Sequence, residues 1–204
     1  MIPKYFNLYD ISSDFAIEKF FTNKKIAIYT LDIETDYNGE EIKSLKYVDQ
    51  LINIFNENKI PLTVFLEGQL IENHKLFIKN FINNSLIDLN LHCYNHQSNG
   101  DTPETLNKSI DIFNKNFGKI PRGYRANSYH LNKELIESLI NNKFKWDSSI
   151  MPALTVGGNI SKSFLEGDYF KIDQLYEFPL AHYKNIRIAY NHSNQMLLKF
   201  LTKI

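Results

Sequence analysis

Residues 25–36 have the sequence KIAIYTLDIETD, a short apolar run that ends in three acidic residues. The first part is hydrophobic and rich in β-branched residues, which is typical of a buried parallel strand. Side chains two residues apart in an extended chain share a face, so Asp32, Glu34 and Asp36 are expected to point the same way. Because neighbouring carboxylates repel and are costly to bury unpaired, the pattern predicts a cation among them or, alternatively, a solvated acidic turn.

Strands and helices are predicted to alternate on both sides of this stretch. The predicted strands cover about 25–33, 62–66, 87–92, 121–126, 144–148 and 175–181, and the predicted helices cover about 12–20, 44–58, 71–84, 103–117, 131–142 and 193–203. Strands that alternate with helices of about 12 residues predict a parallel sheet, either open or closed into a barrel. No repeat or linker divides the chain, so residues 1–204 are predicted to form a single domain.

Composition and charge exclude several classes of protein. The chain has 23 Lys and Arg against 23 Asp and Glu, so no net field attracts nucleic acid or an anionic membrane. The single cysteine, Cys93, excludes an internal disulfide framework. No apolar run approaches the roughly 20 residues needed to span a bilayer, and the first residues lack the pattern of a signal peptide. We therefore expect a soluble, cytoplasmic protein.

Polar residues follow several of the predicted strands. In parallel α/β folds, the residues that bind and react gather where strands end and loops begin, on one rim of the sheet. The polar residues at these strand ends are Asp32, Glu34, Asp36, His92, His96, Arg125 and Asp147. Imidazoles, carboxylates and an arginine from separate segments are thus expected to converge.

His92 and His96 have a spacing that suits a metal ion. Residues four apart on one helical turn lie on one face with Cβ atoms roughly 5–6 Å apart, which lets two imidazole nitrogens reach one Zn²⁺ at roughly 2.0–2.1 Å. A carboxylate from the first strand would complete three protein ligands and leave one position for water, as in catalytic sites. The alternative is a chance pair of histidines in a non-hydrolytic α/β domain. Cys93 is predicted to be a small buried hydrophobe.

Four ordered motifs make the chain resemble the polysaccharide deacetylase family, also called carbohydrate esterase family 4 or the NodB-homology domain. The aspartate-pair, His-x-x-x-His, aromatic-Arg-x-Pro and late-aspartate motifs are matched in turn by Thr30–Glu34 (TLDIE), Leu91–His96 (LHCYNH), Tyr124–Asn127 (YRAN) and Lys145–Ser149 (KWDSS). The resemblance covers roughly residues 25–182. It implies a distorted (β/α) barrel of about seven parallel strands.

The resemblance also implies a divalent metal, usually Zn²⁺. His92 and His96 match two of its ligands, and Glu34 matches the metal carboxylate in the variant where one residue separates the two acids. Asp36 is the competing carboxylate. The metal would lower the pKa of bound water toward about 7 and polarise the amide carbonyl of the substrate.

The catalytic roles implied by the resemblance fall on three further side chains. Asp32 matches the general base that takes a proton as water attacks the acetamide carbon. Arg125 matches the arginine that holds this base, and Asp147 matches the partner of the arginine, although an ordinary ion pair is the alternative for these two. The amide of Ser128 could help to hold the oxyanion. The implied substrate is an N-acetylated amino sugar or polysaccharide precursor, and no oligomeric state is indicated.

Three departures from the family pattern bear on activity. Asn127 stands where the family has proline, and Glu34 is longer than aspartate. The family also has a fifth motif, a Leu-x-His on a late strand, whose histidine is the general acid for the departing amine. Here that histidine is matched by His182 in Leu180–His182, or it lies on a further strand beyond Ile204. We favour the second interpretation. The sequence thus predicts a metal-dependent N-deacetylase, with a catalytically impaired sugar-binding or relic module as the alternative.

Overall fold

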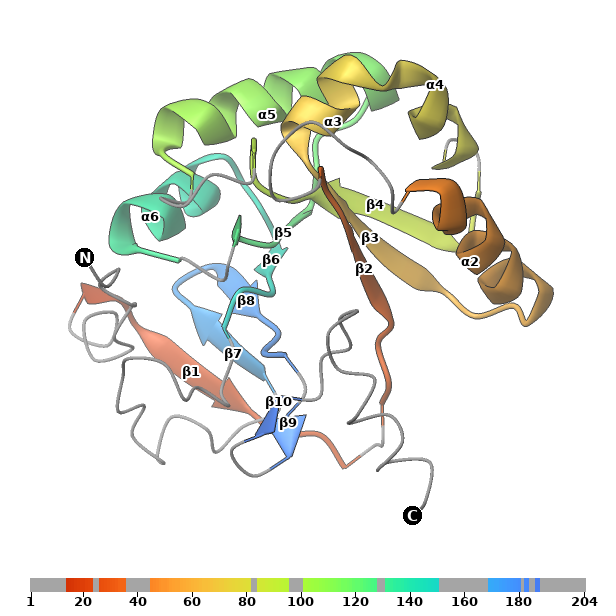
Figure 1. Cartoon of the computed structure of the whole chain (residues 1–204). Coiled ribbons are helices and arrows are strands. Elements are labelled where there is room, and N and C mark those ends of the chain that lie inside the picture. The colour runs from red at the N-terminus through yellow and green to blue at the C-terminus, as the bar shows by residue number, and fades with distance from the viewer. Residues whose placement is uncertain are drawn as a thin grey trace.

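The computed structural model shows an α/β fold built on one large sheet (Figure 1). It describes residues 14–23, 26–35, 45–81, 84–95, 101–127, 131–150, 169–180, 182–183 and 186–187. The strands of the sheet are β1 (Ile17–Phe20), β2 (Thr30–Ile33), β3 (Leu62–Leu66), β4 (Ile87–Leu91), β5 (Gly123–Tyr124), β6 (Trp146–Asp147), β7 (Tyr169–Ile172) and β8 (Leu175–Glu177). In space they follow the order β1-β7-β8-β6-β5-β4-β3-β2. A separate pair is formed by β9 (His182–Tyr183) and β10 (Ile186–Arg187).

Most of this sheet is parallel. The strands β2, β3, β4, β5, β6 and β8 run in one direction, each bonded to the next, whereas β7 is antiparallel to β8 and β1 is antiparallel to β7. The predicted α/β fold with a mostly parallel sheet is therefore confirmed. Among the described residues, β1 and β2 are the two edges of the sheet. The distorted barrel of about seven parallel strands, with or without a last strand, stays a prediction.

The helices lie along the outer side of the sheet (Figure 1). They are α2 (Leu45–Glu57), α3 (Gly68–Asn73), α4 (Lys75–Ile78), α5 (Pro103–Phe117) and α6 (Lys133–Asn141), with a 3₁₀ turn at Lys79–Phe81. The helix predicted over 71–84 begins earlier and is interrupted at His74, whose φ of −122° and ψ of 53° lie outside the helical region. The helix predicted over 193–203 lies outside the described residues.

Local chemistry at both ends fixes the bounds of α5. Thr102 accepts a hydrogen bond from the amide of Thr105, and the Thr105 side chain bonds back to the amide of Thr102, which is a capping box. Pro103 occupies the first turn, and Gly118 ends the helix in the left-handed conformation with φ of 65°. The predicted helix over 103–117 is confirmed, and Thr102 is its cap.

Two predictions near the N-terminus are wrong. Residues 17–20 form the strand β1 and not the end of a helix, because they pair with β7, a strand that was not predicted from the sequence. Ser12, Ser13 and Asp14 are residue types that cap helices, and they led to the predicted helix. Pairing with a distant segment outweighs this local signal. Residues 26–29 are not a buried strand, since Ile26 is 65% and Ile28 61% exposed. The reason is that β2, which follows them, has β3 as its only neighbour in the described sheet.

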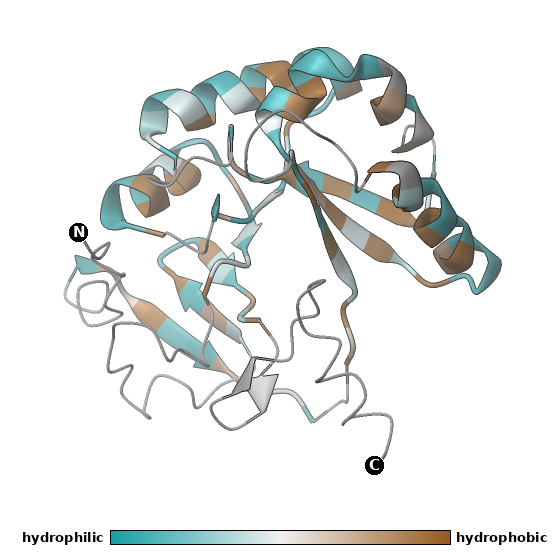
Figure 2. Ribbon diagram, in the orientation of Figure 1, coloured by the Kyte–Doolittle hydropathy of each residue, from teal (hydrophilic) through white to brown (hydrophobic). Residues whose placement is uncertain are grey.

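The hydrophobic core lies between the sheet and the helices. Hydrophobic residues recur along the strands and along the helices that cover them (Figure 2). The largest side chains that are fully buried include Tyr124, Phe65, Phe81 and Phe113. No helix of the described residues is long and apolar enough to cross a membrane.

Candidate metal and catalytic site

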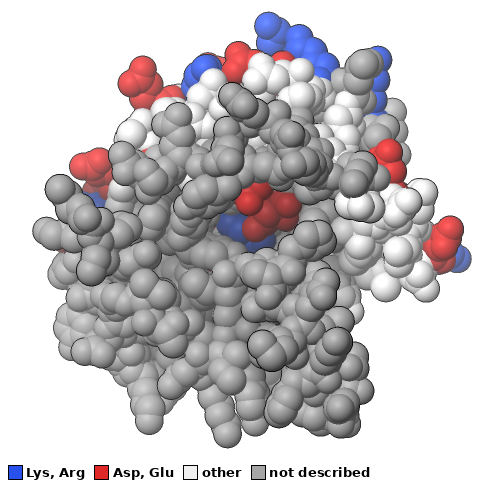
Figure 3. Space-filling model, in the orientation of Figure 1, with Lys and Arg blue, Asp and Glu red and all other residues white. Residues whose placement is uncertain are grey.

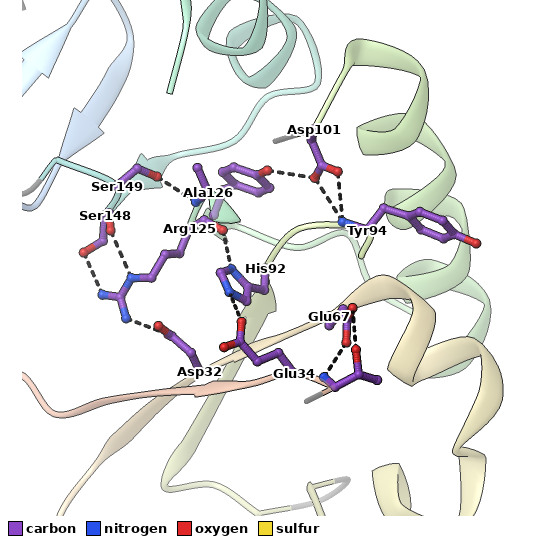
Figure 4. Close-up of polar contacts among 12 residues, drawn as sticks. Asp32, Glu34, Glu67, His92, Tyr94, Asp101, Arg125, Ala126, Ser148 and Ser149 are labelled. Atoms are coloured by element: carbon purple, nitrogen blue, oxygen red, sulfur yellow. Dashed lines mark hydrogen bonds and ion pairs between the residues drawn. The ribbon is translucent and has the colours of Figure 1, made fainter. Parts of the chain in front are cut away.

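The polar residues that follow β2, β4 and β5 meet at one edge of the sheet. These strands are parallel, so their carboxyl ends lie on the same side. Asp32 and Glu34 reach from β2 toward Arg125, which follows β5, and His92, which follows β4 (Figure 4). Acidic and basic side chains lie together near the middle of the face shown in Figure 3. The convergence expected from the strand ends is present for these four residues.

His92 is buried and bonded at both ring nitrogens. Its Nδ1 lies 2.6 Å from the backbone oxygen of Arg125, and its Nε2 lies 2.8 Å from Oε2 of Glu34. A carbonyl oxygen can only accept, so Nδ1 carries a hydrogen and Nε2 is the nitrogen that faces the carboxylate. This is the arrangement in which a second contact orients a histidine toward a metal ion.

The surroundings of His92 favour its protonated form. Burial by itself lowers the pKa of His92, but the hydrogen bond to Glu34 and the charges of Asp32 and Glu34 together outweigh burial and raise the pKa to about 9. Without a metal, a proton therefore sits between Nε2 of His92 and Glu34 at neutral pH. A divalent cation could take the place of this proton, since imidazole nitrogen and carboxylate oxygen are both zinc ligands.

Arg125 is buried and held on every side. Its Nη1 donates to Asp32 at 2.7 Å and to Thr30 at 3.0 Å, while Nε and Nη2 donate to the backbone oxygen and the hydroxyl of Ser148 at 3.0 and 2.8 Å. The guanidinium also lies 4.2 Å from the centre of the Phe65 ring. Asp32 keeps 27% of its side-chain surface exposed while its partner keeps 3%. A rigid cation thus positions a carboxylate that solvent can reach.

Arg125 also joins the two halves of the site. Its guanidinium binds Asp32, and its backbone oxygen accepts from His92, which faces Glu34. One residue therefore fixes both the carboxylate that could accept a proton and the imidazole that could bind a metal.

Comparison with known proteins identifies the family. The family model described as polysaccharide deacetylase matches residues 22–145. The chain belongs to the polysaccharide deacetylase family. The resemblance stated from the four sequence motifs is confirmed.

Solved structures of carbohydrate esterase family 4 share the fold. The chain is 18% identical to a Mycobacterium smegmatis protein assigned to the polysaccharide deacetylases, with a TM-score of 0.58 over 80% of this chain and 64% of that chain. It is 19% identical to a family 4 pseudoenzyme from Bacillus anthracis, with a TM-score of 0.50 over 60% of this chain and 42% of that chain. The chain thus spans less than two thirds of the length of either protein. No curated protein matches the sequence.

Asp147, the late aspartate of the deacetylase motifs, lies beside Arg125 without bonding to it. The arginine bonds instead to Ser148, the next residue, and both oxygens of Asp147 accept from Ser149, from its amide at 2.9 Å and its hydroxyl at 2.8 Å. Burial raises the pKa of Asp147, and the charge of Arg125 opposes this rise. Asp147 therefore acts on the arginine through charge and through the adjacent loop.

Glu67 is a buried acid of the site that was not predicted from the sequence. It follows β3 directly, and its two oxygens accept from the amide of Thr35 at 2.7 Å and from the Thr35 hydroxyl at 3.1 Å. Glu67 thereby fixes the residue next to Glu34. The signal in the sequence was an acidic residue immediately after an apolar strand, the same signal that singled out Asp32.

Asp101 is a second buried acid that was missed as a site residue. Its oxygens accept from the amide of Tyr94 at 3.0 and 3.1 Å and from the hydroxyl of Tyr124 at 2.8 Å. Tyr94 lies in the loop that carries the His-x-x-x-His motif. Asp101 therefore anchors this loop. Its position directly before the helix cap Thr102 gave no sign of this role in the sequence.

Several predicted residues lie outside the described part of the structure. They are Asp36, His96 and Ser128, together with the side chain of His182 in β9. Within the described residues, no group of three or more His, Cys, Asp or Glu could hold a metal ion, and Glu34 with His92 is the close pair. Cys93 is buried, as predicted.

Proposed function

We propose that this family member is a metal-dependent hydrolase that removes an N-acetyl group from an amino sugar or polysaccharide precursor. The observation that carries the proposal is the link made by Arg125 between the Asp32 carboxylate and the His92–Glu34 pair. Membership of the polysaccharide deacetylases supports an acetylated carbohydrate as the substrate. It also supports a single domain with a barrel-like sheet.

The proposed metal ligands are Glu34, His92 and His96, with Asp36 as the competing carboxylate. A bound divalent cation, Zn²⁺ in our proposal, would supply an acidic water molecule and polarise the carbonyl oxygen of the substrate. The chain itself contributes the orientation of His92, because the backbone oxygen of Arg125 fixes which nitrogen faces the ligand position.

The proposed general base is Asp32. The adjacent guanidinium of Arg125 is a permanent positive charge that matches Asp32 in its carboxylate form, the form that can accept a proton. Asp32 takes the proton of the attacking water and returns it toward the departing amine, directly or through a second group. Among the histidines of this chain, His182 is the candidate for that second group.

The alternative function is a catalytically impaired domain that binds sugar. It is favoured by one finding, the similarity of the fold to a Bacillus anthracis pseudoenzyme of carbohydrate esterase family 4. A mutant of that pseudoenzyme is described as having restored enzymatic activity, so mutation decided whether that protein is active. Metal content does not separate the two functions, whereas turnover does.

Acetate release tests the proposed function. We expect the zinc-loaded protein to release acetate from N-acetylglucosamine oligomers, and expect a chelator to abolish the release and added metal to restore it. Acetate would be measured by a coupled enzymatic assay. A chelator-treated sample without added metal is the control. Sugar binding with full metal occupancy and no acetate release, over a panel of polymeric, nucleotide-linked and lipid-linked N-acetyl sugars, would support the impaired domain instead.

Metal binding is expected to release a proton from His92. Its pKa of about 9 in the metal-free protein means that the ligand nitrogen is protonated at pH 7. The apparent affinity for Zn²⁺ should therefore rise by up to about tenfold per pH unit until the pH reaches that value. Calorimetry at pH 7 in two buffers of different ionisation enthalpy counts the protons released.

The stability of the metal-free protein provides a check on the same group. The pKa of His92 is higher in the folded protein than its ordinary value of 6.5. The stabilisation that His92 contributes should thus be complete below about pH 6.5 and disappear as the pH rises through about 9. As a control, His74→Ala changes an exposed histidine and should alter neither the pH dependence of zinc affinity nor the pH dependence of stability. Zinc binding without proton release at pH 7 would contradict the assignment of His92 as a ligand.

A further inference from the structure

Two buried acids, Asp147 and Glu177, face each other across neighbouring strands. Asp147 on β6 pairs in register with Glu177 on the parallel strand β8, so both side chains project from the same face of the sheet. Neither residue has exposed surface. Two carboxylates this close, both removed from water, cannot both be ionised without a large cost.

The hydrogen bonds of the pair show which oxygen lacks a donor. Both oxygens of Asp147 accept from Ser149, and Oε1 of Glu177 accepts from the amide of Ile150 at 2.8 Å. Within the described part of the chain, Oε2 of Glu177 is buried and receives no hydrogen bond. A buried oxygen without a donor is rare in proteins. A proton on this oxygen would turn it into a donor toward Asp147.

The electrostatic surroundings agree with this placement of the proton. Burial raises the pKa of Glu177 well above its ordinary value, and the negative charge of Asp147 raises it further. Burial also raises the pKa of Asp147, but the hydrogen bonds from Ser149 and the charge of Arg125 oppose that rise. The charged groups that act on Glu177 are Asp147, which raises its pKa, and Arg125, which lowers it.

We propose that Glu177 is a positioning residue that carries a proton at neutral pH and donates it to Asp147. The pair then holds the backbone that follows Ser148, the residue that accepts two hydrogen bonds from Arg125. Asp147 fixes Ser149, and Glu177 fixes the amide of Ile150 beyond it.

A second contact links the acid pair to the backbone next to Arg125. The hydroxyl of Ser149, which donates to Asp147, accepts at 2.8 Å from the amide of Ala126, the residue after Arg125. The backbone that follows Arg125 is thereby tied to Asp147 through Ser149. The positioning role rests on the proposed function, since it concerns the orientation of Asp32, whereas the protonation of Glu177 does not.

The protonation is tested by measuring stability against pH for Glu177→Gln. A glutamine keeps the shape and can donate to Asp147 at any pH. In the parent, the unfolded chain loses the Glu177 proton above about pH 4.3 while the folded chain keeps it, so stability falls as the pH rises toward the folded pKa. Relative to the variant, the folding equilibrium constant of the parent should fall by up to about tenfold per pH unit.

The control is Glu137→Gln, the same chemical change at an exposed position of α6. Its stability profile should follow that of the parent. A profile of Glu177→Gln that runs parallel to the parent from pH 4 to 8 would overturn the proposal. Infrared spectroscopy is independent of the variant: the parent at pH 7 should show a carboxylic-acid carbonyl band that shifts when glutamate is labelled with ¹³C. Absence of a glutamate band would overturn the proposal even if Glu177→Gln failed to fold.

Activity separates positioning from mere packing. Glu177→Ala should lower kcat at least about tenfold, and Glu177→Gln should recover most of that loss, because an amide can replace the protonated acid. A Glu177→Gln variant as impaired as Glu177→Ala would overturn the positioning role. If no substrate is turned over by the parent, the stability and infrared results still decide the protonation, so the failure of the proposed function is distinguishable.

Discussion

Asp32→Asn should lower acetate release by about 10²–10⁴-fold, the usual contribution of general base catalysis. Asparagine keeps the shape of the side chain and can still accept from Arg125 through its oxygen, but it cannot take a proton from water. The fold and the metal content should change little, because Glu34 and His92 keep their mutual contact. Single-turnover kinetics and elemental analysis measure the two effects.

The matched control is Asp111→Asn, which makes the same change at an exposed position of α5. It should retain the rate of the parent. If Asp32→Asn loses the metal, Asp32 is a ligand and the proposed division of roles at the end of β2 is wrong. If it keeps the rate of the parent, Asp32 is not the base.

Arg125→Ala should destabilise the fold by about 3–5 kcal/mol, the cost of removing one partner from a buried ion pair. The loss also leaves the hydroxyl and backbone oxygen of Ser148 without their donors. We expect the lower part of that range, because Asp32 is partly exposed and water can solvate it. Such a loss is a large share of the roughly 5–15 kcal/mol that keeps a domain folded. Urea unfolding measures the change.

Two further variants show whether the stabilisation by Arg125 depends on the geometry of its hydrogen bonds or on its charge alone. Arg125→Lys keeps the charge but cannot form the forked bonds to Asp32 and Ser148, so its stability should lie between those of the parent and Arg125→Ala. Arg122→Ala removes an exposed arginine three residues earlier and should change stability by less than about 0.5 kcal/mol. Equal losses in Arg122→Ala and Arg125→Ala would refute the structural role of the Arg125 bonds.

Features with a local cause could be predicted from the sequence. The bounds of α5 follow from a capping box and a left-handed glycine, which involve only neighbouring residues. The strand β3 follows from a short apolar run that begins after Pro61. Asp32, Glu34, His92 and Arg125 could be grouped before their contacts were known, because parallel strands bring their carboxyl ends to one edge.

Features that depend on partners far away in the chain could not be predicted. Residues that favour helix capping, Ser12, Ser13 and Asp14, precede residues 17–20. Residues 17–20 nevertheless form a strand, because β7, about 150 residues later, supplies the backbone hydrogen bonds. Glu67, Asp101 and Glu177 are also buried because segments distant in the sequence supply their hydrogen-bond donors. A lone acidic residue in a sequence looks solvated, since its cost of burial is offset only by donors that the fold brings from elsewhere.

The sequence thus predicts which kinds of side chain gather at the sheet edge, because residue types and strand periodicity are local features that extend over only a few residues. Which acid binds the arginine, which one binds the histidine and which one carries a proton depend on distances of about 3 Å between separate strands. Those distances are set by the register of β2, β6 and β8 in the folded sheet, and no local pattern encodes them.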